Sequence, residues 1–443
     1  MAERHYPQEW SEWWEYLAEG LHGRCRWRLG IVIFGMLFAG GRRTVTSWLR
    51  AAGITYDFSD YYYFIATVGR RAQTLATRLF LLLQDQLPEQ PRWLFAIDDT
   101  PTKRYGPKVQ GAGVHHNPTP GPADAKFVYG HVWVTLAWVV RHATWGTIGL
   151  PLRALLYIKQ KDMPKLPKQL KWTFQTKLQQ AAALIQWLAQ LAQAAGEVVW
   201  VVADGAYAKR PVMKTALAAR VVLVSRLRKD AALYSLPLSP TDPSRRGRKP
   251  KYGKKRITLY KRAGQKRGWQ TIECVQYGET VIKTYKSFLA TYHPAYGLIR
   301  VVIVKEDKGP EYFFCTDPAA GVREILEALA DRGAIEQDFH DLKEVWGAGQ
   351  QQLRDLWANI GAYHLNLWIH SLVELWAWTR NKASLCNRRA CPWDDPKRRP
   401  SHADRRRALR STLFEAQLLA AVEQRPIPRK ILTFAKRLMR LAA

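Results

Sequence analysis

The chain has 443 residues, of which 47% are hydrophobic and 12% aromatic, so it has too much core-forming material for a disordered or collagen-like protein. Lys and Arg total 68 against 37 Asp and Glu, a formal net charge of +31, which favours a polyanion such as nucleic acid as partner. No apolar run is long enough to predict a membrane-spanning helix, and the five scattered cysteines fit reduced thiols better than a disulfide framework. The composition therefore predicts a cytoplasmic protein of several domains that binds nucleic acid.

The first ninety residues have the periodicity of short helices. Residues 42–52 are followed by Gly53, which is typical of a helix end, and Thr44 or Thr46 can cap the beginning of this helix. Residues 63–84 continue with apolar side chains three and four positions apart. Both a helix-turn-helix-like unit and a plain helical bundle agree with this pattern. We assign residues 1–90 to a helical N-terminal DNA-binding region.

The next region, residues 91–221, alternates predicted strands and helices. Residues 93–97 form a short apolar run that ends at Asp98 and Asp99, and residues 197–203 form a second run that ends at Asp204. Further strands are predicted at residues 129–140 and 147–158, and a long amphipathic helix at residues 174–195. Two buried strands therefore each deliver a carboxylate at one end, which is where mixed α/β sheets commonly carry their chemistry.

Residues 222–316 are rich in β-branched and aromatic runs, and we interpret them as a β-rich insertion. Eight of the thirteen residues in 244–256 are basic. This stretch is either a flexible, solvated loop or an arm that contacts phosphates, and the net charge of the chain favours the arm. The candidate phosphate contacts are Arg245, Arg246, Arg248, Lys249 and Lys251.

Trp269 is a further candidate in this insertion. It follows the basic pair Lys266 and Arg267, so its ring is placed to stack on an unpaired base. Packing in the β core is the alternative interpretation.

The last part of the chain is predicted to be helical, with the second part of the α/β core at residues 317–385 and a basic region at residues 386–443. One helix carries Glu336, with Arg332 one turn before it and Lys343 seven residues after it, on nearly the same face. A carboxylate flanked by two cations stays ionised while the cations hold phosphates. An ordinary intrahelical charge network is the alternative.

The three acidic positions together predict phosphodiester cleavage. Carboxylates that converge within a few ångströms repel one another unless divalent cations lie between them, and Mg²⁺ prefers such oxygen ligands. Two ions about 4 Å apart activate the attacking oxygen and stabilise the leaving oxygen. A strongly basic protein then holds the polyanion over this site.

Three segments resemble the DDE transposases of bacterial insertion sequences, specifically the insertion-sequence-four-like group. They are Ile97-Asp98-Asp99-Thr100, the segment 201–207 that contains Asp204, and Arg332-x3-Glu336-x6-Lys343. The resemblance covers roughly residues 93–350 and implies an RNase H-like core interrupted by a β-strand insertion. It also implies that Asp204 and Glu336 are the second and third metal-binding acids, with Arg332 and Lys343 as phosphate-holding partners.

The first acid stays open between the two neighbouring aspartates, and we favour Asp98 over Asp99 because only one of them can point into a site on one face of a strand. The sequence departs from the family at Leu329, where the family has a tyrosine.

What the resemblance implies about function is a bacterial, nucleoid-associated transposase that binds terminal inverted repeats and target DNA. It implies Mg²⁺ as cofactor, with Mn²⁺ able to substitute, metal held by Asp98, Asp204 and Glu336, and a homodimer as the active complex. The alternatives are an RNase H-like nuclease that cuts without joining and a non-catalytic DNA-binding protein derived from a transposase.

Overall fold

The computed structural model describes residues 6–117, 125–237, 250–386, 393–395, 397–424, 428, 431, 433 and 435. The α-helices are α1 (Gln8–Ala18), α2 (Trp27–Phe38), α3 (Val45–Ala51), α4 (Phe58–Arg70), α5 (Ala72–Gln86), α6 (Lys177–Ala195), α7 (Arg210–Ala218), α8 (Leu259–Gly264), α9 (Val322–Asp331), α10 (Gly333–Glu344), α11 (Leu356–Trp378), α12 (Lys382–Leu385) and α13 (His402–Gln424). The strands are β1 (Trp93–Lys103), β2 (Gly113–His116), β3 (Phe127–His142), β4 (Gly146–Tyr157), β5 (Val199–Ala203), β6 (Val222–Arg226), β7 (Leu233–Tyr234), β8 (Arg256–Ile257), β9 (Gln270–Gln276), β10 (Glu279–Tyr292), β11 (Gly297–Glu306) and β12 (Gly309–Cys315).

All of these strands belong to one mixed sheet. Its main path runs β2-β3-β1-β5-β6-β12-β11-β10-β7-β8, with β4 beside β3 and β9 beside β10. In the core, β3 pairs antiparallel with β1, whereas β1, β5 and β6 are parallel neighbours. The parallel strands are almost continuously apolar and buried, as strands covered on both faces are. The mixed α/β architecture confirms the predicted RNase H-like fold class.

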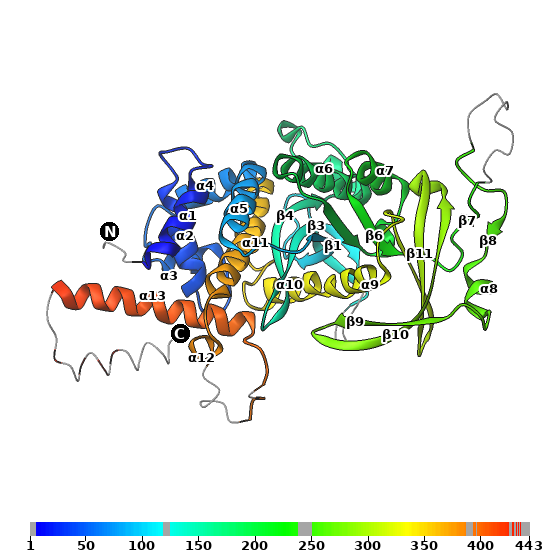
Figure 1. Cartoon of the computed structure of the whole chain (residues 1–443). Helices are drawn as coiled ribbons and strands as arrows, with labels where there is room; N and C mark the ends of the chain where they lie inside the picture. The colour runs from blue at the N-terminus through cyan, green and yellow to red at the C-terminus, as the bar shows by residue number, and fades with distance from the viewer. Residues whose placement is uncertain are drawn as a thin grey trace.

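Helices cover both faces of the core strands. Figure 1 shows α6 and α7 on one face and α9 and α10 on the other. Helix α6 begins with a capping box in which Thr176 and Gln179 exchange hydrogen bonds, and it ends at Gly196, whose φ of 75° is easily adopted only by glycine. These boundaries agree with the helix predicted at residues 174–195.

The N-terminal helices pack as a bundle around α11. Thr44, one of the two caps that the sequence offered, is the N-cap of α3 and accepts a hydrogen bond from the backbone N–H of Ser47. Helix α11 is almost completely buried, because it lies between the bundle and β4 (Figure 1). Most of its side chains are apolar, but buried polar ones such as His370 and Glu374 lie among them. Among the described residues, no helix is both long and apolar enough to cross a membrane.

The β-rich segment continues the core sheet instead of standing apart from it. Strand β6, which we grouped with the insertion, pairs in parallel with β5, and β12 then pairs antiparallel with β6. The β9–β10 hairpin turns back beneath α9 (Figure 1). It is fastened there by a hydrogen bond from the Arg323 guanidinium to the carbonyl of Glu273 and by one from the Val275 N–H to the Glu327 carboxylate. The domain boundaries themselves stay predictions.

Candidate active site

Asp98 and Asp204 lie on neighbouring parallel strands. Ile97 of β1 is aligned with Ala203 of β5, so the two aspartates that follow are side by side at one position of the sheet. One oxygen of Asp98 accepts a hydrogen bond from the backbone N–H of Asp99 at 2.8 Å, and the other accepts one from Arg332 at 2.9 Å. The two predicted acids are therefore neighbours. Only Asp204 stands at a strand end, however: the prediction that the first strand ends at Asp98 was wrong, because β1 stays paired with β3 as far as Lys103.

Asp99 points to the opposite face of the sheet, because side chains alternate along a strand. Its carboxylate accepts hydrogen bonds from the Tyr207 hydroxyl and from the Lys177 ammonium of α6, both at 2.6 Å. Burial and the nearby Asp99 carboxylate raise the pKa of Tyr207 above its usual value, so this hydroxyl remains a donor. These contacts commit Asp99 to the α6 side and favour Asp98 as the first acid.

Asp204 stands where β5 ends. Its backbone is extended and its carboxylate accepts a hydrogen bond from the Ala206 N–H at 3.2 Å, so it caps the single helical turn that follows. Its side chain is half-buried and lines a cavity together with Arg332. A strand-end aspartate of this kind can hold a ligand and cap a turn at the same time.

Arg332 joins the acids of two distant segments. It lies between α9 and α10, and its backbone is helical. The helical geometry therefore extends back through Gly333, as is needed for Arg332 to lie one turn before Glu336 on the same edge. One terminal nitrogen of Arg332 donates to Asp98, and the other donates to Glu336 at 2.6 Å. Asp98 and Glu336 therefore lie on either side of one guanidinium. Lys343 is half-buried further along α10.

Glu336 is the most accessible of the acids. Its side chain is 59% exposed, against 21% for Asp98. An exposed carboxylate on the helix edge can turn toward a cation while its partner on the strand stays fixed.

The electrostatics of Asp98 fit a cation site. Burial raises the pKa of Asp98 to about 6, Asp99 and Asp204 add to this rise by repulsion, and the Asp99 N–H and Arg332 oppose it. A carboxylate in this position gains from any cation placed beside it. The Arg332 guanidinium occupies that place between Asp98 and Glu336. The oxygen donors of Asp98, Asp204 and Glu336 are the ligand type that Mg²⁺ prefers.

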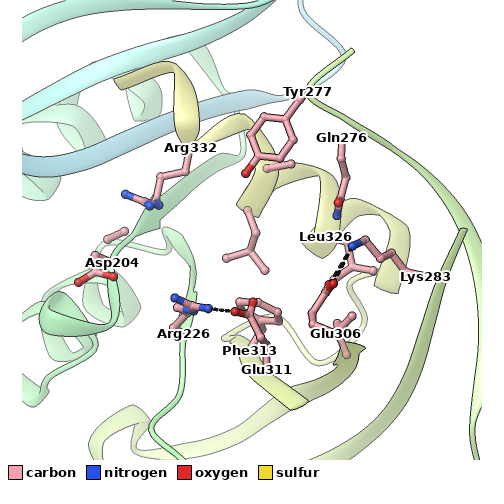
Figure 2. Close-up of a pocket in the computed structure, with 14 residues that line it drawn as sticks. Asp204, Arg226, Gln276, Tyr277, Lys283, Glu306, Glu311, Phe313, Leu326 and Arg332 are labelled. Carbon is pink, nitrogen blue, oxygen red and sulfur yellow. Dashed lines mark hydrogen bonds and ion pairs between the residues drawn. The ribbon is translucent and has the colours of Figure 1, made fainter. Parts of the chain in front are cut away.

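A cavity of about 330 Å³ opens beside these residues. Figure 2 shows Asp204 and Arg332 on the core side of this cavity and Gln276, Tyr277 and Lys283 of the β9–β10 hairpin on the other. Two of its cations are already paired, Arg226 with Glu311 and Lys283 with Glu306. The cavity is therefore a polar space between the insertion and Asp204 with Arg332, and neither Asp98 nor Glu336 lines it.

Tyr277 is a candidate functional residue that the sequence analysis missed. It stands in the turn between β9 and β10 with a φ of 55°, and it is 82% exposed. A Cβ at Gly333 would be 3.3 Å from its ring, so the ring lies against the junction that carries Arg332. It also lines the same cavity as Leu329, the position where the family has a tyrosine. The only sequence signal was the Tyr-Gly pair of a hairpin turn.

Of the six other predicted DNA contacts, two lie within the residues that the structure describes and four lie outside them. The Trp269 ring is half-buried, with the Lys286 ammonium 4.6 Å from its centre and its own N–H bonded to the carbonyl of Gln265. Lys251 is exposed. Four predicted contacts lie outside the residues that the structure describes, namely Arg245, Arg246, Arg248 and Lys249. The roles assigned to all six stay predictions.

Comparison with known proteins identifies the family. The profile of the family described as DDE superfamily endonuclease matches residues 17–285, more than half of the chain. The matched part contains Asp98, Asp204 and Tyr277 but ends before α10, so Glu336 is associated with the site by its contact with Arg332. No functionally curated protein matches the chain significantly. The predicted relation to DDE transposases is confirmed at this level, whereas the insertion-sequence-four-like subgroup stays a prediction. The chain belongs to the DDE superfamily endonuclease family.

Proposed function

We propose that this protein is a DNA transposase that binds the ends of its element, cleaves phosphodiester bonds with Mg²⁺ and joins the 3′-hydroxyl strand to target DNA. Nucleases of its family generally use divalent metal ions and act on DNA. The observation that carries the proposal is that Asp204 lies beside Asp98 and that Arg332 joins Asp98 to Glu336, in a chain with a net charge of +31.

The three acids have separate tasks in this proposal. Asp98 and Asp204 are fixed by the register of β1 and β5, so they form the rigid side of the site. Glu336 completes it from α10. Asp98, Asp204 and Glu336 would hold Mg²⁺, which would supply activation of the attacking oxygen and stabilisation of the leaving oxygen. Because Asp98 has a raised pKa, it must lose its proton before it can take part as an ionised ligand.

Arg332 exchanges partners when substrate binds. In the structure its guanidinium is shared between Asp98 and Glu336. With a metal held by these carboxylates, the guanidinium would be available to the scissile phosphate, for which its planar fork is well suited. Lys343 adds a second positive charge along α10. The basic residues of the insertion, including Lys251, also bind the DNA backbone.

Tyr277 contacts the DNA beside the cleaved bond. Its exposed ring stands at the mouth of the cavity, next to Arg332 (Figure 2). An exposed aromatic beside a phosphate site can stack on a base of any sequence. We expect two copies of the chain to act together on paired ends.

The test is a cleavage assay on labelled DNA that carries the terminal repeats flanking the coding sequence. Wild-type protein with Mg²⁺ is expected to cut at the repeat end and to give joined product with a target plasmid. Glu336→Gln is expected to lower cleavage at least a thousandfold while end binding stays within about threefold, because only metal-dependent chemistry is removed. Glu344→Gln, an exposed glutamate at the other end of α10, is the matched control and should cut like wild type.

Each alternative function has its own outcome. Cutting without joined product identifies a nuclease, and end binding without cutting in any divalent metal identifies a DNA-binding protein. Undiminished cutting by Glu336→Gln removes this residue from the mechanism.

A further inference from the structure

A cluster of buried charged and polar side chains lies behind the helix that carries Glu336. It consists of Asp338 on α10, Trp346 just after α10, His370 and Glu374 on α11, and His402 and Arg405 on α13. We call it the histidine cluster. All six side chains are almost fully buried, with exposures between 1% and 4%. Such groups are costly to bury, so their arrangement calls for an explanation.

The centre of the histidine cluster is a pair of stacked imidazole rings. The rings of His370 and His402 are 3.9 Å apart and inclined by 14°. His402 bonds to Glu374 through Nδ1 at 2.5 Å, and Arg405 pairs with the other oxygen of Glu374. This joins α13 firmly to α11.

Two contacts connect these stacked rings to α10 and to Trp346, which follows it. Asp338 forms an ion pair with His370 at 3.4 Å, and the Trp346 N–H donates to Nε2 of His402 at 2.8 Å. The second oxygen of Asp338 packs against β4 at Gly149, where a Cβ would be 2.0 Å from it. Asp338 is buried, whereas Glu336, two residues earlier, is exposed. The contacts of Asp338 and Trp346 therefore hold the buried face of the helix, and Glu336 lies on its exposed face.

His370, Glu374 and His402 also have the donor atoms of a metal site, all within 4.8 Å of one another. The hydrogen bonds speak against an ion there. Because Nε2 of His402 accepts from Trp346, its proton must be on Nδ1, where it is donated to Glu374. Both ring nitrogens of His402 are therefore occupied, and Glu374 is shared between His402 and Arg405.

We propose that the histidine cluster is a positioning device that fixes α10, and with it Glu336 and Arg332, relative to the strand acids, so that α13 is part of the catalytic unit. The proposal rests on the proposed function, because it assigns a purpose to the placement of Glu336. A cavity of about 820 Å³ runs from Glu336 to Asp338, His370 and His402, so the helix is not held there by tight packing alone. The hydrogen-bonded cluster supplies the constraint instead.

The test measures how cleavage depends on metal concentration. In His402→Leu both hydrogen bonds of the imidazole are lost, so the Mg²⁺ concentration for half-maximal cleavage should rise about 10- to 100-fold, the usual effect of losing a group that supports a metal ligand. The rate at saturating Mg²⁺ and the affinity for end DNA should change much less. His402→Gln, which can accept from Trp346 and donate to Glu374, should recover most of the loss. His340→Leu, on the same helix but with its side chain 64% exposed, is the control.

Several outcomes overturn the proposal. One is an unchanged metal dependence in a folded His402→Leu protein, and another is the finding of one equivalent of tightly bound zinc that this variant loses. If His402→Leu does not fold by circular dichroism, Asp338→Asn replaces it and should shift the metal dependence in the same direction. Calorimetric titration with Mn²⁺ separates this proposal from the function itself. Wild-type protein that binds Mn²⁺ but does not cut contradicts the proposed function, whereas equal Mn²⁺ affinity in wild type and His402→Leu contradicts only the positioning role.

Discussion

Two neighbouring aspartates, Asp98 and Asp99, have different surroundings because a strand turns them to opposite faces. Asp98 meets Arg332, whereas Asp99 is held by Tyr207 and Lys177. The sequence leaves the choice between them open, since either can follow a buried apolar run. The contacts on the two faces of the strand distinguish Asp98 from Asp99.

A pair of substitutions tests this separation. Asp98→Asn should abolish metal-dependent cleavage, because it removes a charged ligand. Asp99→Asn should retain cleavage within about tenfold, because the amide oxygen can still accept from Tyr207. The measurement is initial cleavage rate at saturating Mg²⁺. Greater loss in Asp99→Asn than in Asp98→Asn would reverse the assignment.

The raised pKa of Asp98 predicts a stability effect without metal. The folded protein holds a proton on Asp98 up to about pH 6, whereas an unfolded chain releases it near pH 4. Ionised Asp98 therefore destabilises the fold, and the loss of stability grows as pH rises from 4 to 6 and is complete above it. Asparagine cannot ionise, so Asp98→Asn avoids this loss of stability, although its bond to Arg332 is weaker. We therefore expect the free energy of unfolding to rise by about 1 kcal/mol at pH 7.

Thermal unfolding in EDTA measures this effect. The melting temperature of Asp98→Asn should exceed that of wild type at pH 7, and the difference should vanish near pH 4. A difference that is constant with pH would mean that Asp98 is not the titrating group.

Tyr277 is predicted to hold the DNA at the site. Tyr277→Ala should lower cleavage about tenfold, which corresponds to about 1.4 kcal/mol of lost stacking, and Tyr277→Phe should retain it. Tyr260→Ala removes another exposed tyrosine of the insertion, 72% exposed, and serves as control. A loss in Tyr277→Phe equal to that in Tyr277→Ala would assign the effect to the hydroxyl and not to the ring.

At the scale of elements, α4 and α11 cross with their backbones in close contact. A Cβ at Gly69 would be 2.0 Å from the carbonyl oxygen of Trp357, and one at Gly361 would be 2.0 Å from that of Ile65. The two backbones touch because neither glycine has a side chain. Through this crossing the N-terminal bundle is attached to the catalytic core.

Gly361→Ala is therefore expected to destabilise the protein by about 1–3 kcal/mol, or more if the helices cannot move apart. Chemical denaturation gives this value. Gly264→Ala, at a site where a Cβ meets nothing within 4 Å, should be close to neutral. Equal stability of Gly361→Ala and wild type would show that the two helices separate easily.

The sequence predicts most core elements because their apolar patterns are local. The run that ends at Asp204 became β5, the run before Asp98 became the first half of the longer β1, and the helix predicted at residues 174–195 became α6. The features that the sequence does not predict depend on contacts between segments that are far apart along the chain. Tyr277 becomes notable only when the hairpin turns back to Gly333. His370 becomes notable only when α10 and α13 pack against the mostly apolar α11.

At the scale of the whole molecule, the net charge of +31 is expected to attract DNA to the protein. Binding of end DNA should weaken steeply with salt, since each phosphate contact releases counterions. With six to ten such contacts, affinity should fall about 10³- to 10⁵-fold between 50 and 200 mM salt. Fluorescence anisotropy at several salt concentrations gives the slope, and a change of less than about tenfold would contradict extensive phosphate contact.

The central claim is that acids from β1, β5 and α10 share divalent cations. Anomalous scattering from Mn²⁺ in crystals of the protein with end DNA tests it most directly. The account predicts one or two peaks, about 4 Å apart if there are two, in contact with the carboxylates of Asp98, Asp204 and Glu336. Mn²⁺ bound elsewhere, or bound by the strand aspartates with Glu336 still turned to Arg332, would contradict it.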